Sequence, residues 1–161
     1  MKHLILIHTL LITLFTTPLI NCYAQNAAKV KSTMEEIVKK HEAKEGISCM
    51  TVAKGSGLEM VKMMFNKEFG KDFMKGVRKM SIIEYSDASK ETCMAIRKDL
   101  DTFTSLLKEF DLSGEKKFSN NSFVRCFALN ADDSSLSDFL IAMEDDEAKM
   151  VLYMAGVIKI Q

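Results

Sequence analysis

Residues 122–160, SFVRCFALNADDSSLSDFLIAMEDDEAKMVLYMAGVIKI, decide the fold. Three apolar runs in this stretch, rich in β-branched and aromatic residues, predict strands over Ser122 to Leu129, Leu136 to Met143 and Met150 to Ile160. The polar turns that separate them, NADD and EDDE, are too short to contain crossover helices. We therefore expect these three strands to form an antiparallel meander.

Upstream of the meander, predicted helices and strands alternate along the chain. Apolar residues recur every three or four positions, which predicts helices, over Asn26 to Glu45, Leu58 to about Phe69 and Ser89 to Phe110. Two short apolar runs, Ile47 to Ala53 and Arg78 to Ser86, predict strands. The resulting order, α-β-α-β-α-β-β-β, predicts an α+β fold of two layers. Helices should pack on one face of a mixed or antiparallel sheet of about five strands.

The last three strands carry more apolar side chains than one buried sheet face can hold. Successive side chains of a strand point to opposite faces, yet apolar residues occupy both alternations of these runs. If helices cover only one face, some aromatic surface should stay exposed for a partner. Phe123, Phe127 and Tyr153 are the candidate residues of this interaction surface.

The N-terminus has the pattern of an export signal. Lys2 precedes the apolar run Leu4 to Leu14, Pro18 breaks the helical pattern, and the run is too short for a membrane span. The small side chain of Ala24 suits cleavage before Gln25. We expect the protein to be exported and to reside in the periplasm, at the outer membrane or outside the cell.

Cys22 provides an alternative to simple cleavage. The sequence Leu19-Ile20-Asn21-Cys22 has the outline of a bacterial lipobox, in which the cysteine is acylated and becomes the mature N-terminus. The lipobox favours a small residue before the cysteine, and Asn21 is larger and polar. Attachment to a membrane is expected only if Cys22 is lipidated.

Size and charge restrict the class of protein. Removal of residues 1–24 would leave 137 residues, so residues 25–161 are expected to form a single α+β domain. These residues carry 21 basic and 22 acidic side chains, a formal charge of −1, which argues against binding of nucleic acid. Basic residues outnumber acidic ones between Lys62 and Lys79, and we interpret this local excess as a solvated face.

Three cysteines follow the predicted signal. Three are too few for a disulfide framework, and an odd number of cysteines cannot all be paired within the chain. Cys49, Cys93 and Cys126 each have apolar neighbours, so we expect their thiols to pack in the core. The alternative is a single bridge, between Cys49 and Cys126, if the two strands that carry them are neighbours.

No catalytic residue, metal site or cofactor is predicted. His41 is the only histidine after the signal and lies on a charged helix, where we expect a partly exposed surface residue. Gly55-Ser56-Gly57, between a strand and a helix, lacks the rest of a phosphate-loop or dinucleotide motif and is interpreted as a tight turn with Ser56 as the helix N-cap.

Methionines and acidic turns give two further candidates for metal binding. Met60, Met63, Met64, Met74 and Met80 could supply thioether ligands to copper, but Met64 shares an apolar stripe with core positions. The acidic turns at 132–133 and 144–147 lack the spacing of a calcium loop, so solvated turns are the preferred interpretation.

Several segments together resemble domain-of-unknown-function family 4252, small exported proteins known mainly from the Bacteroidota. The resemblance covers about Val38 to Ile160. The segments that carry it are Glu45-Gly46-Ile47-Ser48 through Met63-Met64-Phe65, Met80-Ser81-Ile82-Ile83-Glu84-Tyr85-Ser86, Leu136 to Met143, and Val151 to Ile158 with Ala155-Gly156-Val157-Ile158. The resemblance implies an envelope protein and no catalytic signature.

The expected function is a non-enzymatic envelope protein that binds another protein, or itself, through the exposed sheet face. The first alternative is a binder of a small apolar molecule or lipid in a cleft between helices and sheet, because the chain is rich in methionine and phenylalanine. The second alternative is a hydrolase.

Overall fold

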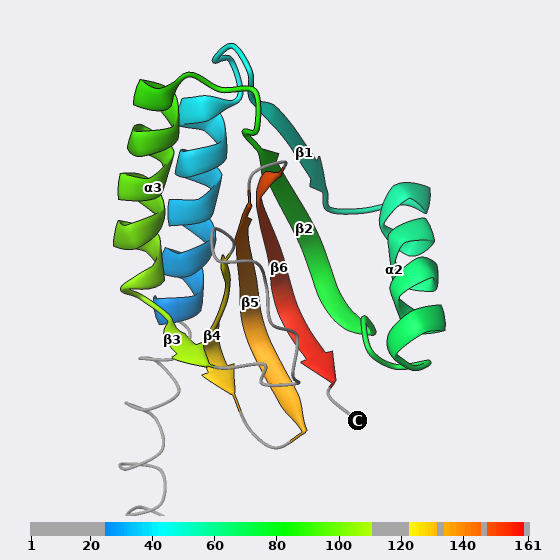
Figure 1. Ribbon diagram of the computed structural model, residues 1–161. Helices are drawn as coiled ribbons and strands as arrows, with labels where there is room; N and C mark the ends of the chain where they lie inside the picture. The colour runs from blue at the N-terminus through cyan, green and yellow to red at the C-terminus, as the bar shows by residue number, and fades with distance from the viewer. Residues whose placement is uncertain (1–24, 111–122, 132–133, 146–147, 160–161) are drawn as a thin grey trace, which may run out of the picture.

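The computed structural model describes residues 25–110, 123–131, 134–145 and 148–159 (Figure 1). After a helix over residues 25–41, the elements are β1 (Ser48–Val52), α2 (Ser56–Phe69), β2 (Gly76–Glu84), α3 (Lys90–Thr104), β3 (Lys108–Phe110), β4 (Phe123–Ala131), β5 (Ser135–Glu144) and β6 (Lys149–Lys159). The predicted α+β class and element order are confirmed, with one strand more than expected.

The described strands form one open antiparallel sheet in the order β1-β2-β6-β5-β4-β3. The predicted meander is present as β4-β5-β6, and β6 pairs on its other edge with β2. The sixth strand arises because α3 ends at Thr104, well before the predicted end at Phe110. Two tight turns follow, in which Leu106 and Leu107 donate to the carbonyls of Phe103 and Thr104, and the chain then extends along β4.

Helix 25–41 and α3 cover one face of the sheet (Figure 1). They contribute Met34, Ile37, Ile96 and Phe103 to a buried cluster that contains both Phe127 and Tyr153. The ring of Phe103 packs edge-on against Tyr153, with a centroid distance of 5.7 Å.

The prediction of an exposed aromatic surface at Phe127 and Tyr153 is therefore wrong. Both side chains are at most 3 % exposed, because they occupy the sheet face that the two helices cover. Phe123 begins β4, and its side chain lies outside the described part of the structure.

The opposite face of the sheet carries a second apolar cluster. Met154 follows Tyr153 in β6 and so faces the other side, where Met80, Phe139 and Leu152 are also buried. Val61 and Phe65 of α2 pack against this cluster. Helices thus contribute to both faces, which explains why both alternations of the last strands are apolar.

The three cysteines in the described part of the chain have free thiols. Cys93 and Cys126 are buried as predicted, whereas Cys49 is only partly buried. A bridge between Cys49 and Cys126 is incompatible with the sheet, because β2, β6 and β5 separate the two strands and each step between neighbours is about 4.8 Å. The two residues also belong to clusters on opposite faces.

Candidate functional site

Helix α2 presents apolar side chains on two sides. Leu58 is buried and Val61 and Phe65 pack against the cluster on the sheet, whereas Met60, Met63 and Met64 are 60 %, 68 % and 64 % exposed. The three methionines are spaced so that they form a second stripe on the outer side of the helix. The expectation that Met64 packs in the core is wrong, because this residue belongs to the outer stripe. We call Met60, Met63 and Met64 the methionine stripe.

The turn before α2 sets where the helix begins. Gly55 occupies the N-cap position at a φ of 79°, a backbone conformation that favours glycine, and no side chain caps the first turn. Ser56 is the first helical residue and is exposed, so the expected N-cap role of its hydroxyl is not observed.

A turn after α2 returns the chain to the sheet beside the helix. Gly70 ends the helix, and the side-chain carbonyl of Asn66 accepts a hydrogen bond of 2.8 Å from the N–H of Met74. Met74 itself is fully buried. The turn is thereby fixed against the last two turns of α2.

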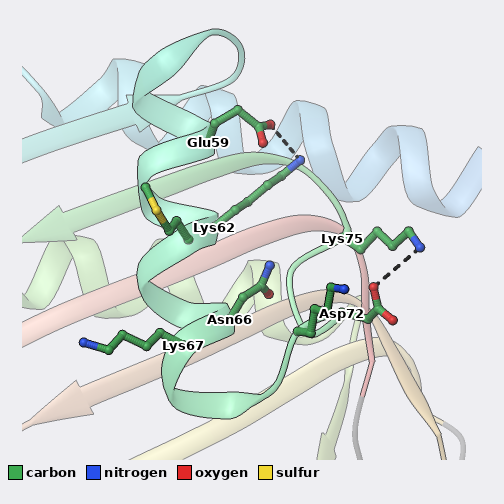
Figure 2. Close-up of a pocket in the computed structure, with 8 residues that line it drawn as sticks. Glu59, Lys62, Asn66, Lys67, Asp72 and Lys75 are labelled. Atoms are coloured by element: carbon green, nitrogen blue, oxygen red, sulfur yellow. Dashed lines mark hydrogen bonds and ion pairs between the residues drawn. The ribbon is translucent and has the colours of Figure 1, made fainter.

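A cavity of about 580 Å³ lies between α2 and this turn (Figure 2). Its lining consists of one methionine, one asparagine, four lysines and two carboxylates: Met63, Asn66, Lys62, Lys67, Lys71, Lys75, Glu59 and Asp72. Lys62 lies 3.2 Å from Glu59, and Lys75 lies 3.5 Å from Asp72. Lys67 and Lys71 form no ion pair with a described residue, so the lining keeps a net charge of +2.

The chemistry of this surface suits binding. Ammonium groups and a polarizable thioether face solvent together, beside a helix that is anchored on its inner side. The sequence signals of this site were the excess of lysine between Lys62 and Lys79 and the methionine-dense segment that includes Met60, Met63 and Met64. Periodicity alone could not show that three of the methionines face outward.

The prediction that His41 is a surface residue is wrong. Its side chain is fully buried, and its Nε2 lies 2.7 Å from Oδ2 of Asp99 on α3, which also pairs with Lys40. Burial raises the pKa of Asp99, but hydrogen bonds from Lys40 and His41 outweigh this, so the pKa lies below its ordinary value. His41 continues the apolar stripe of its helix, which is the signal that could have placed it inside.

Glu144 was expected in a solvated turn and is instead 5 % exposed. Tyr85 donates a 2.6 Å hydrogen bond to its Oε1, and Arg97 of α3 binds both carboxylate oxygens. Burial raises the pKa of Glu144, but the hydrogen bonds from Arg97 and Tyr85 outweigh burial and hold the pKa below its ordinary value. This network joins α3 to the sheet.

The remaining candidates are divided between described and undescribed parts of the chain. Cys22 and Ala24, like the turn residues Asp132 and Asp133, lie outside the described residues. Within the described ranges, no group of three or more histidine, cysteine, aspartate or glutamate side chains could hold a metal ion. The described helices include none with the length and apolar character needed to cross a bilayer.

Comparisons with protein-family models, with curated proteins and with solved structures found no match to this chain. The resemblance to domain-of-unknown-function family 4252 remains a prediction from the sequence.

Proposed function

We propose that this chain is an exported envelope protein that acts without catalysis, by binding a partner protein through α2. The observation that carries the proposal is the methionine stripe, with three large apolar side chains exposed side by side on one helix. Flexible, polarizable methionine side chains are common in surfaces that adapt to protein partners. Export, and membership of family 4252, are parts of this proposal that rest on the sequence patterns.

Charge indicates what kind of partner fits. The cavity beside the stripe has a net charge of +2, and Lys67 and Lys71 form no ion pair with a described residue. A segment with apolar side chains on one side and carboxylates on the other would cover the methionines and pair with these lysines. We therefore propose an acidic amphipathic segment of another protein as the occupant.

Self-association through the same surface is less favourable. In a two-fold symmetric contact the same patch meets itself, which would bring Lys67 and Lys71 of one copy toward those of the other. Like charges placed opposite each other across an interface oppose binding. The four lysines that line the α2 cavity disfavour an apolar small molecule or lipid chain as its occupant.

Site-specific photo-crosslinking in the native envelope tests the proposal. A benzophenone amino acid at Met63 should capture a protein whose crosslinked segment, mapped by mass spectrometry, is acidic and amphipathic. The same probe at Met94, which is 62 % exposed on α3, is the matched control and should not capture it. Lys67→Glu with Lys71→Glu should abolish capture because the charge pairing is reversed.

Three outcomes would contradict the proposal: a covalent homodimer, an adduct with lipid alone, or equal capture from both positions. Near-identical thermal midpoints of the variants would show that their folds are intact, because substitutions at exposed positions change stability little.

A further inference from the structure

A second cavity lies between α3 and the start of β6. It has a volume of about 530 Å³ and is lined by Ala88, Lys90, Cys93, Met94, Arg97 and Lys149. Neither α2 nor its turn contributes to this lining, so the cavity is separate from the methionine stripe.

The lining is strongly cationic. Of the six described lining residues, Lys90, Arg97 and Lys149 carry positive charge and none is acidic. Arg97 is already bound to the carboxylate of Glu144, which is buried. When that carboxylate is counted with the three cations, the net charge is +2.

The guanidinium of Arg97 is held in place before any ligand arrives. Glu144 accepts hydrogen bonds from Nε and Nη2 of Arg97, with the Nε contact at 2.9 Å, and is itself fixed by Tyr85. Among the described residues none accepts from Nη1 of Arg97, and half of the Arg97 side chain is exposed to solvent, so Nη1 can donate to a ligand. A fixed donor loses less conformational entropy on binding than a mobile one.

We propose that this cavity binds a phosphate group, either free or as the phosphate monoester of a larger molecule. Such a group carries about −1.5 to −2 charges at neutral pH, which matches the net charge of the cavity, and its oxygens can accept from three cations at once. Side chains, rather than the N–H groups at the start of α3, would supply these contacts. In the first turn of α3 the Thr92 N–H already donates to Ser89 Oγ, at a distance of 3.2 Å.

Methionine-methyl NMR with inorganic phosphate tests the proposal. The Met94 methyl lies in the cavity wall and should shift saturably, whereas the methyl of Met50, which is exposed on β1 and lines neither cavity, serves as an internal control. Chloride at matched ionic strength should not produce the same shift. Lys90→Gln and Lys149→Gln should each weaken phosphate binding about three- to tenfold.

Lys98→Gln is the matched control, because Lys98 is exposed on the same helix and does not line the cavity. No saturable shift of Met94, an equal effect of chloride, or equal weakening by Lys98→Gln would overturn the proposal. Where phosphate binds, glucose 6-phosphate and vesicles containing phosphatidic acid distinguish a soluble phosphate ester from a lipid headgroup. Arg97 is left intact, since its loss would leave Glu144 buried without its cation.

Discussion

At the scale of single residues, Asp138 combines three unusual features. It is buried, it has a φ of 48°, which side-chain-bearing residues rarely adopt, and it lies where the register of β5 against β6 shifts between Ser137 and Phe139. Its Oδ1 accepts a 3.0 Å hydrogen bond from the hydroxyl of Tyr153. The bulge thus turns a carboxylate into the helix-covered face, where it pairs with a buried tyrosine.

Substitutions of Asp138 should separate backbone strain from hydrogen bonding. Asp138→Ala removes the acceptor of the Tyr153 hydroxyl and keeps a side chain at positive φ, so we expect the free energy of unfolding to fall by about 2–3 kcal/mol. Asp138→Gly removes the acceptor but relieves the strain, so its loss should be smaller by about 1 kcal/mol. Urea unfolding measures both values. An alanine variant at least as stable as the glycine variant would contradict this account.

At the scale of elements, sequence periodicity predicted each helix and strand in the described part of the chain except β3. β3 was missed because Leu107 and Phe110 continue the helical spacing of α3, although the chain leaves the helix at Ser105. The orientation of α2 was missed for a related reason. Apolar residues occur on both sides of this helix, so periodicity could not show which stripe packs and which faces solvent.

The two stripes of α2 should differ sharply in their effect on stability. Leu58→Ala removes a buried side chain and should lower the free energy of unfolding by about 2–4 kcal/mol. Met60→Ala, two residues away on the exposed side, should change it by less than about 0.5 kcal/mol. Chemical denaturation of the two variants checks this contrast. A large loss for Met60→Ala would mean that the outer stripe is covered within the monomer.

At the scale of the whole molecule, the face of the sheet that each strand residue occupies could not be predicted from composition. The sequence showed correctly that apolar residues point to both faces of the last three strands. The inference that one face of the sheet stays open was wrong, because α2 packs against the apolar cluster on the second face. The buried polar groups were also missed. Tyr85 directly follows β2 and Glu144 ends β5, and the order of β2, β6 and β5 in the sheet brings them within hydrogen-bond distance.

These buried polar groups should limit the stability of the fold at both ends of the pH scale. The folded-state pKa of Glu144 lies below its ordinary value of 4.5, so its stabilising contribution is complete above that value and is lost as the pH falls through the folded pKa. Burial, together with the carboxylates of Glu144 and Asp138, raises the pKa values of Tyr85 and Tyr153 above their ordinary value of 10.0. The contribution of each tyrosine is therefore complete below that pH and is lost as the pH rises toward its folded pKa.

Unfolding in urea over a series of pH values tests this expectation. The free energy of unfolding should decline on the acid side as Glu144 becomes protonated and on the alkaline side above the ordinary tyrosine pKa. Glu144→Gln should flatten the acid decline and Tyr153→Phe the alkaline one, because each removes a group that titrates differently in the folded and unfolded states. Tyr153→Phe is also the control for the acid end, which it should leave unchanged. Glu144→Gln should reduce part of the alkaline decline as well, because the Glu144 carboxylate helps to raise the pKa of Tyr85. An acid decline that is equally steep in Glu144→Gln would show that other carboxylates control acid unfolding.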